Sequence, residues 1–411
     1  MLGSPNLIDS GLVLLFLTAL NATDAVTEGF LPAAARLGLP VVILTDQPDP
    51  HIAAYSDHAY PPEAVVACAV RDGREVIDAV HRAGPATGLL TNSDHLQVPT
   101  AQAAHFLGLP GKDWRAALRC KDKALTRRAL ADCGLDRTAA AVLAPGEGPP
   151  AAMVYPAVVK PRQGVASEDV YLVVDADELA TRIEEIRRRR PDVALVVEEY
   201  LSGELYTFDT LGDAADLAVV GSWQTTLASP PTFVEQRLDW SPALDPAVRE
   251  SLLAQLRALG VGLGACHTEF VLCDGRPRII EVNYRLIGDR MDLVLARLLD
   301  VPLFEHVIRL HLGEPLDALA LPDPVAVPRH AAVEYVCADR AGTLREAPGR
   351  VDLTVGEVRL SARPLRTVGT SAPLRGTNRD YLAAVEAIGP DRCAVDAAIA
   401  EFRATRRWVI A

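Results

Sequence analysis

Two glutamates in a predicted β-hairpin are the residues best placed to do chemistry in this chain of 411 residues. Glu269 and Glu281 lie on adjacent apolar segments, and a three-residue loop at 274–276 would place their carboxylates opposite each other. Like charges at that spacing destabilise a sheet unless a cation lies between them. Asn283 and Arg285 follow Glu281 with a period of two, so the three side chains share one face. Two carboxylates and an amide oxygen suit Mg²⁺ or Mn²⁺, whereas the alternative is a pair of exposed glutamates on a solvated sheet.

Lysine is scarce in this sequence and therefore draws attention wherever it occurs. The four lysines among the 41 basic residues are Lys112, Lys121, Lys123 and Lys160. Lys160 ends an apolar segment, and the loop after it contains Gly164 and Ser167, whose backbone N–H groups and hydroxyl can bind phosphate oxygens. Lys123 begins a separate predicted helix and can reach the same phosphates. A solvent-facing lysine, or a lysine-poor genome, is the alternative explanation.

A third segment, VVEEYLSGE at residues 196–204, allows two interpretations. It can be an ordinary strand end, or it can be a connector whose backbone reads adenine while Glu204 accepts a hydrogen bond from a ribose hydroxyl. The spacing alone favours neither.

Strands and helices alternate in the first 110 or so residues, which predicts a doubly wound α/β domain. The expected elements are strands at 12–17, 40–45 and 88–91, a helical stretch that follows a turn at 21–24 and ends at Leu37, and helices at 74–82 and 94–107. The first strand has no GxGxxG after it, so a dinucleotide-binding site is not supported.

The rest of the chain reads as α+β, with a strand-rich final section. The strands expected besides the hairpin are 157–160, 170–174, 194–199, 204–211 and 217–223. The expected helices are 121–133, 176–190, 246–259, 291–299, 379–387 and 394–405. We expect a Pro-rich loop at 229–242 and a linker where proline recurs at 315–328. The loops at 91–95 and 229–240 are expected to build a substrate pocket.

Composition excludes several partners. The formal net charge of −13 argues against nucleic acid or an anionic membrane, and 49% hydrophobic residues provide ample core. The longest apolar run, residues 12–20, is too short to cross a membrane. A signal peptide is the competing interpretation, but Asp9 precedes the run without any basic residue. Seven scattered cysteines form no CxxC pair, so we expect a soluble cytoplasmic protein without a disulfide framework.

Taken in order, these segments resemble the ATP-grasp superfamily of carboxylate–amine or carboxylate–thiol ligases. The motif EVNYR with HTEF upstream looks most like the L-amino acid ligase branch. The resemblance implies an α/β domain at 1–115, an ATP-grasp N-lobe at 116–200, a C-lobe with the metal site at 201–320 and an α+β subdomain at 321–411.

The resemblance also implies roles for individual residues. ATP phosphates would be held by Lys123 and Lys160 under a flap at Gly164 to Ser167. Adenine would be read by Glu198, Glu199 and Leu201, and ribose by Glu204. The magnesium ligands would be Glu269, Glu281 and Asn283, with Arg285 steadying an acyl phosphate and His267 lining the same site. The chain departs from the family pattern in a phosphate loop with one glycine and in Tyr284, which would lie near the substrate.

The function implied by this resemblance is ATP-dependent joining of a carboxylate, activated as an acyl phosphate, to an amine. The expected partners are these small molecules, and a homodimer is left open. Two alternatives remain: an ATP-dependent carboxylase or formyl/carboxyl transferase with the same fold, and a nucleotide-binding regulatory module without turnover.

Overall fold

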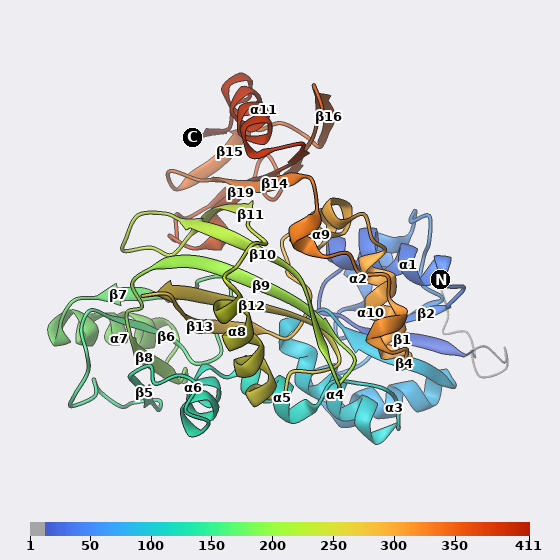
Figure 1. The fold of residues 1–411 in the computed structure, drawn as a ribbon, viewed down its shortest axis with the longest axis horizontal. Helices are drawn as coiled ribbons and strands as arrows, with labels where there is room; N and C mark the ends of the chain where they lie inside the picture. The colour runs from blue at the N-terminus through green and yellow to red at the C-terminus, as the bar shows by residue number, and fades with distance from the viewer. Residues whose placement is uncertain (1–12) are drawn as a thin grey trace.

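The computed structural model describes residues 13–411, which form two four-stranded sheets, one nine-stranded sheet and one three-stranded sheet (Figure 1). Leu12 of the expected first strand lies outside the described residues, and so does Asp9, on which the argument against a signal peptide depends. Within the described residues, no helix is long and apolar enough to cross a membrane.

The N-terminal domain is a parallel sheet with the strand order β3-β2-β1-β4. Its strands are β1 (Leu14–Thr18), β2 (Val41–Thr45), β3 (Ala64–Ala67) and β4 (Ala86–Thr91). Its helices are η2 (Ala25–Phe30), α1 (Leu31–Arg36), α2 (Pro48–Tyr55), α3 (Gly73–Ala83), η3 (Asp94–Leu96) and α4 (Gln97–Phe106). Every residue of β1 and β2 is buried, because helices cover both faces of the sheet. The predicted doubly wound domain is confirmed, although β3 and α2 were not expected.

The second unit begins with two helices, α5 (Trp114–Lys121) and α6 (Lys123–Asp132), where one helix at 121–133 was expected. The break lies at Asp122, whose carboxylate accepts hydrogen bonds from the backbone N–H groups of Ala124 and Leu125, both at 3.1 Å. This is N-cap geometry, so Asp122 ends α5 and starts α6.

A small antiparallel sheet follows, in the order β5-β8-β6-β7. Its elements are β5 (Ala140–Leu143), β6 (Ala157–Pro161), β7 (Tyr171–Val173), β8 (Leu195–Glu199) and the helix α7 (Ala176–Arg189). Leu179, Ile183 and Ile186 on one side of α7 pack against Val159 and Val197 of the sheet. The apolar spacing along α7 therefore fixes which face of this sheet stays free to border a cleft.

The long antiparallel sheet has the order β13-β12-β9-β10-β11-β14-β19-β17-β16. Its strands are β9 (Glu204–Gly212), β10 (Leu217–Leu227), β11 (Glu235–Trp240), β12 (Gly264–Cys273), β13 (Arg276–Asn283), β14 (His330–Cys337), β16 (Val351–Val355), β17 (Val358–Pro364) and β19 (Tyr381–Gly389). Helix α8 (Pro246–Leu259) packs on β9, β12 and β13 through a cluster that contains Phe208 and Phe270. The sheet continues across residue 320, where a domain boundary was expected.

Two expectations about this sheet are wrong. The predicted helix at 379–387 is mostly strand β19, and the predicted loop at 229–242 contains strand β11. Strand β19 lies between β14 and β17, and eight of its nine residues are buried, so its alanine-rich sequence lacks the alternation of a half-exposed strand. Strand β11 is held by pairing with β10 and β14, which lies almost 100 residues further along the chain.

The three-stranded sheet and α11 (Arg392–Thr405) complete the C-terminal part, at the top of Figure 1. The short strands are β15 (Gly342–Glu346), β18 (Ser371–Ala372) and β20 (Val409–Ile410), in the order β18-β15-β20. The expected helix at 394–405 is confirmed, and Asp391 caps its first turn.

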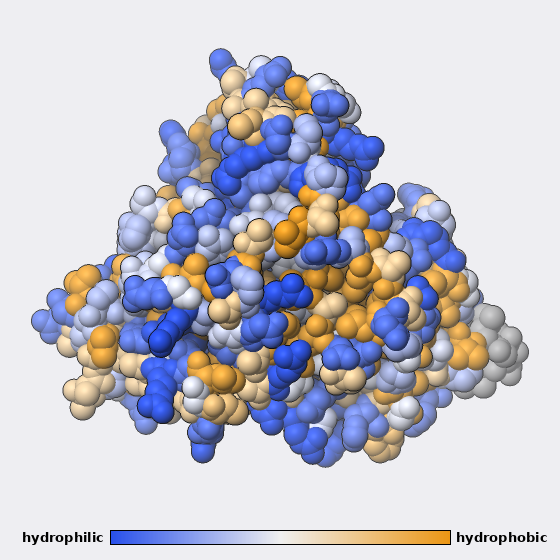
Figure 2. Space-filling view, in the orientation of Figure 1, coloured by the Kyte–Doolittle hydropathy of each residue, from blue (hydrophilic) through white to orange (hydrophobic). Residues whose placement is uncertain are grey.

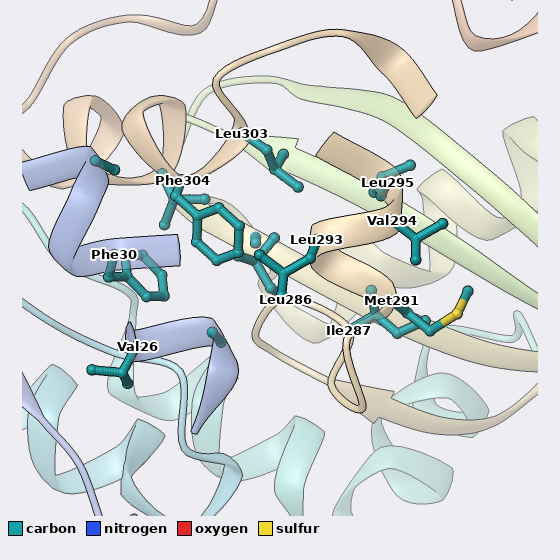
Figure 3. Close-up of a cluster of buried hydrophobic side chains, with 14 of the residues drawn as sticks. Val26, Phe30, Leu286, Ile287, Met291, Leu293, Val294, Leu295, Leu303 and Phe304 are labelled. Atoms are coloured by element: carbon teal, nitrogen blue, oxygen red, sulfur yellow. The ribbon is translucent and has the colours of Figure 1, made fainter. Parts of the chain in front are cut away.

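Helices α9 (Met291–Leu299) and α10 (Leu303–His311) join the N-terminal domain to the long sheet. Figure 3 shows Phe304 of α10 beside Phe30 of η2, with ring centroids 5.0 Å apart, and Leu286, Ile287 and the side chains of α9 nearby. Figure 2 shows apolar side chains gathered on one face over the region of α9 and α10. This packing fixes the segment between β13 and α9 against the N-terminal domain.

Candidate active site

The two glutamates of the hairpin lie opposite each other as expected, but the loop length and the strand register that pair them differ from the expected ones. The loop between β12 and β13 has two residues, Asp274 and Gly275, both with positive φ, rather than three. A two-residue loop alone would pair Glu269 with Ile280. A bulge next to Glu269 shifts the register by one residue and pairs it with Glu281.

The charges around this pair fit a divalent cation. Burial, followed by the charge of Glu281, raises the pKa of Glu269 to about 8. The Asn283 amide nitrogen lies 3.3 Å from Glu269 Oε1, and Lys123 Nζ lies 3.0 Å from Glu281 Oε1. No group of three or more His, Cys, Asp and Glu residues that could hold a metal occurs among residues 13–411. Two facing carboxylates beside an amide form an oxygen-donor set of the kind that Mg²⁺ prefers.

A first cavity lies between the small sheet and the long sheet. It is lined by ten of the residues that the sequence singled out or that neighbour them: Lys123, Lys160, Gly164, Ser167, Glu198, Glu199, Tyr200, Leu201, Glu269 and Glu281. The structure thus brings both lysines, the predicted flap, the connector and both glutamates to one cleft. Glu204 is not a lining residue, although Gly203 and Leu205 on either side of it are.

Lys160 is buried and lines the first cavity, so the alternative of a solvent-facing lysine is excluded. Its Nζ lies 2.7 Å from Glu198 Oε2, and Arg127 Nε lies 2.8 Å from the other oxygen of the same carboxylate. Burial opposes ionisation of Glu198, but the charges of Lys160 and Arg127 outweigh it and hold the pKa of this carboxyl well below its usual range. Glu198 therefore fixes the position of the lysine through its side chain.

The connector residues have separate partners. The Glu199 carboxylate lies 2.7 Å from a guanidinium nitrogen of Arg278, and the Tyr200 N–H donates to the carbonyl of Pro156. The Glu204 carboxylate accepts hydrogen bonds from the Tyr206 hydroxyl at 3.0 Å and from the Gln224 amide at 3.1 Å. Adenine and ribose recognition by these residues stays a prediction.

The predicted flap lies over the first cavity and is anchored to other elements. Ala166, Ser167 and Asp169 have positive φ values of 58°, 54° and 58°. The loop therefore turns sharply, although Gly164 is its one glycine. The Ser167 hydroxyl donates to the carbonyl of Phe233 at 3.1 Å, in the loop between β10 and β11. The flap thus borders the cleft in backbone conformations that asparagine or glycine adopts more readily.

A second cavity opens on the other side of the two glutamates. Its lining includes the remaining predicted residues, His267, Asn283 and Arg285, together with Asn92, Asp94 and His95 from one expected loop and Glu235 and Leu238 from the other. The two cavities share Val165, Glu235, Glu269 and Glu281. A ligand in one cavity can therefore meet a ligand in the other at the glutamate pair.

Arg285 is held at the edge of the second cavity by the N-terminal domain. Its Nε lies 3.9 Å from Asp94 Oδ1, and one of its terminal nitrogens lies 3.4 Å from the Asn283 amide oxygen. The Lys121 ammonium also binds Asp94. His267, on the same wall, has its Nδ1 2.8 Å from Asp209 Oδ1, which fixes the orientation of its ring.

Lys112 lies in the core, outside both cavities. Lys112 is buried, donates to the Gln97 side chain and to the Tyr284 carbonyl, and lies 4.4 Å from the centre of the Tyr284 ring. The Tyr284 hydroxyl donates to the Leu263 carbonyl, so this side chain is part of the core and does not line the second cavity. The expectation that Tyr284 lies near a substrate is therefore wrong.

Sequence reasoning missed the acidic wall of the second cavity. Asp289, Arg290 and Asp292 line it, and the first two have positive φ values of 51° and 71°. Non-glycine residues in this conformation are uncommon and concentrate at functional sites. The segment GDRMD contains a visible charge cluster, but only the turn into α9 directs it toward the cavity.

The fold and this pair of cavities define an ATP-grasp architecture, and the comparisons agree. Residues 31–111 match the family of ATP-grasp N-terminal domains, and residues 120–289 match the family of ATP-grasp domains. The chain is an ATP-grasp domain protein.

Individual relatives extend this result. An uncharacterised protein from Sinorhizobium fredii is 29% identical over 341 residues, which cover 79% of this chain and 68% of that protein. An L-amino acid ligase from Bacillus licheniformis superposes with a TM-score of 0.79 at 20% identity, covering 97% of this chain and 99% of that one. A phosphoribosylglycinamide synthetase from Anaerococcus prevotii has a TM-score of 0.73 at 14% identity, covering 97% and 100%. At these identities the likeness to the two solved structures establishes the fold alone.

Proposed function

We propose that this protein is an ATP-dependent ligase that activates a small carboxylate, such as an amino acid, as an acyl phosphate and joins it to an amine. The observation that carries the proposal is the position of the Glu269–Glu281 pair at the meeting point of the two cavities. A phosphate donor in the first cavity and a carboxylate in the second would meet there.

The residues of the first cavity suit ATP. Lys123 and Lys160 offer two fixed cations to the phosphates, and Leu201 and Val158 offer apolar surface to a base. Glu269, Glu281 and Asn283 would hold Mg²⁺, which would neutralise charge on the transferring phosphoryl group. Phosphoryl transfer needs mainly positioning and charge stabilisation, so it requires no covalent nucleophile from the protein.

The residues of the second cavity suit the carboxyl group. A substrate carboxylate oxygen attacks the γ-phosphorus of ATP, giving an acyl phosphate and ADP. The amine then attacks the acyl carbon, and phosphate leaves as the amide bond forms. Arg285 faces this cavity from a position fixed by Asp94 and Asn283, where it can bind the acyl phosphate and the oxyanion of the tetrahedral intermediate.

The test is ADP release by the purified protein with Mg²⁺ and ATP. We expect release that depends on both an acid and an amine, with an amide product detected by mass spectrometry. Release that depends on bicarbonate alone would indicate a carboxylase, and ATP binding without release under any condition would indicate a regulatory module. Either of these results would overturn the proposal.

A further inference from the structure

The second cavity contains more negative charge than the chain itself compensates. Seven carboxylates line it: Asp24, Asp94, Glu235, Glu269, Glu281, Asp289 and Asp292. Asp24 binds Arg290, Asp94 binds Lys121, and Glu281 binds Lys123. Glu269 and Glu281 are also the pair assigned to a divalent cation. The carboxylates left without an assigned cation are those of Glu235, Asp289 and Asp292.

These three carboxylates have no cationic partner among residues 13–411 at the 4.0 Å separation of an ion pair. The guanidinium groups of the lining have other partners: Arg290 binds Asp24, Glu28 and Glu386, Arg379 lies 2.9 Å from Glu168, and Arg285 lies 3.9 Å from Asp94. Asp292 is the buried member of the three, and a buried charge without a partner is strongly unfavourable unless a ligand brings a cation to it.

Asp292 gives the most direct sign of a missing ligand. Its side chain is 1% exposed and belongs to the cavity lining, and one of its oxygens has no hydrogen-bond partner in the described structure. The other oxygen accepts from the backbone N–H of Leu293 at 2.9 Å. Burial raises the pKa of Asp292 to about 7 and outweighs the lowering effects of the Leu293 N–H, Arg285 and Arg290, while Asp289 adds a smaller rise. A cation beside the free oxygen would satisfy it and restore the charged form.

Asp289 lies three residues earlier, where the chain turns into α9. Positive φ at Asp289 and Arg290 sends the two side chains to different places: Arg290 into its ion pairs with η2 and β19, and Asp289 to the cavity wall. The ion pairs of Arg290 therefore hold the turn that presents Asp289. Asp289 retains accessible surface, so a ligand in the cavity can reach its carboxylate.

The charge of an ordinary amino acid is insufficient for this wall. A zwitterion adds one ammonium and one carboxylate, and its single ammonium can balance only one of the three acids. A substrate with a further positive group is complementary to the remaining two. A simple anionic acid would add repulsion instead.

We propose that one of the two substrates carries a basic group besides the groups that react, and that Asp289 and Asp292 bind this guanidinium or ammonium. The substrate class is thus a basic amino acid or a diamine. This inference rests on the proposed function for the identity of the cavity as a substrate site.

The experiment compares ligands that carry an additional positive group, the charged members, with ligands of matched shape that lack this group, the neutral members. Binding is measured by calorimetry with the full-length protein, Mg²⁺ and a non-hydrolysable ATP analogue. The pairs are L-arginine with L-citrulline, L-lysine with L-norleucine, and putrescine with 1-butylamine. We expect the charged member of at least one pair to bind about 10- to 100-fold more tightly, the size of a charge-assisted hydrogen bond. Ratios below two-fold in all three pairs would overturn the inference.

Variants connect the preference to the two aspartates. Asp289→Asn and Asp292→Asn should each lower the ratio toward one while the neutral member binds as before. Asp339→Asn, which changes an exposed residue that pairs only with Arg340, should leave the ratio unchanged. Thermal melting monitors the fold, and Asp289, being accessible, provides a second variant if the buried Asp292 variant unfolds. A ratio that persists in the folded variants contradicts the assignment.

The same ligands in the ADP-release assay separate the two proposals. Turnover with neutral and charged members alike would retain the ligase and overturn the basic substrate. Aspartate-dependent binding of the charged member without any turnover would overturn the ligase and retain the cation site.

Discussion

The two cavities share a wall, but their charges are organised in opposite ways. In the first cavity, Lys160 pairs with Glu198, and Lys123 pairs with Glu281, so each ammonium has a carboxylate within 3.0 Å. In the second cavity, Glu235, Asp289 and Asp292 have no such partner among the described residues. The lysines of the first cavity are thus compensated within the chain, whereas Asp289 and Asp292, which line the second cavity alone, have no cationic partner in the described part of it.

This difference indicates how the molecule separates a general task from a specific one. Lysines fixed by carboxylates suit a ligand of constant shape, because their positions do not depend on what lies in the other cavity. A wall with uncompensated charge discriminates between substrates, because the wrong ligand leaves its acids unsatisfied. The experiments below test this division and the wall that the two cavities share.

Glu281 belongs to both cavities, so its loss should have the largest effect. Glu281→Ala removes a predicted metal ligand and the partner of Lys123, and we expect turnover to fall about 10³-fold with the fold intact. ADP release and thermal melting are the measurements. Glu184→Ala, on the exposed side of α7, is the control and should remain active. Near-normal turnover of Glu281→Ala at ordinary Mg²⁺ would refute the metal site.

Arg285 belongs to the second cavity alone. Arg285→Ala should keep nucleotide and Mg²⁺ affinity while amide formation falls about 10²- to 10³-fold, because the group that stabilises developing charge is lost. Arg285→Lys should recover part of the rate, since it keeps the charge without the bidentate fork. Equal losses of affinity and rate would contradict the separation of the two cavities.

Lys160 belongs to the first cavity alone. Lys160→Ala should weaken ATP binding about 10- to 100-fold, the size of one or two charge-assisted contacts. It also leaves Glu198 with Arg127 as its remaining partner, so the melting temperature should fall as well. Lys160→Arg should recover the stability through the ion pair but only part of the affinity. A variant with full ATP affinity would show that the lysine is structural.

Lowering the pH should weaken Mg²⁺ binding at Glu269 and Glu281, which line both cavities. The loss of one proton on binding changes the Mg²⁺ affinity by at most about ten-fold per pH unit. The pKa of Glu269 is about 8 in the metal-free protein, so this carboxyl is mainly protonated at pH 7 and must lose a proton to bind Mg²⁺. Affinity should therefore rise from pH 6 to pH 8 and level off above it, with proton release detected by calorimetry in two buffers. Glu269→Gln should abolish the proton release.

The same shift has a consequence for folding. A carboxyl whose pKa is higher in the folded state than its usual 4.5 favours the fold while it is protonated. The metal-free protein should therefore lose stability as the pH rises from about 4.5 toward 8, and Mg²⁺ should restore it. A melting temperature that does not respond to pH in this range would contradict the raised pKa.

Much of the fold followed from local patterns. The all-apolar runs of β1 and β2 predicted a buried parallel sheet, and α8 lies where its helical pattern begins and ends, at residues 246–259. Local patterns failed where tertiary burial removed the usual signal. Strand β19 is buried on both faces and reads as a helix, and the helix α10 was not expected at all.

The sequence by itself determined which groups could do chemistry: the hairpin glutamates, Asn283, the lysines at the starts and ends of elements, and Arg285. Residue type and strand periodicity suffice for this, because they depend only on local geometry. The tertiary structure decided which of these groups meet and what remains uncompensated. Three features depend on segments that are distant in the chain. They are the bulge that pairs Glu269 with Glu281, the ion pair of the buried Lys160, and the turn that presents Asp289 to the cavity that Asp292 also lines. Long-range packing sets them, and no local pattern encodes it.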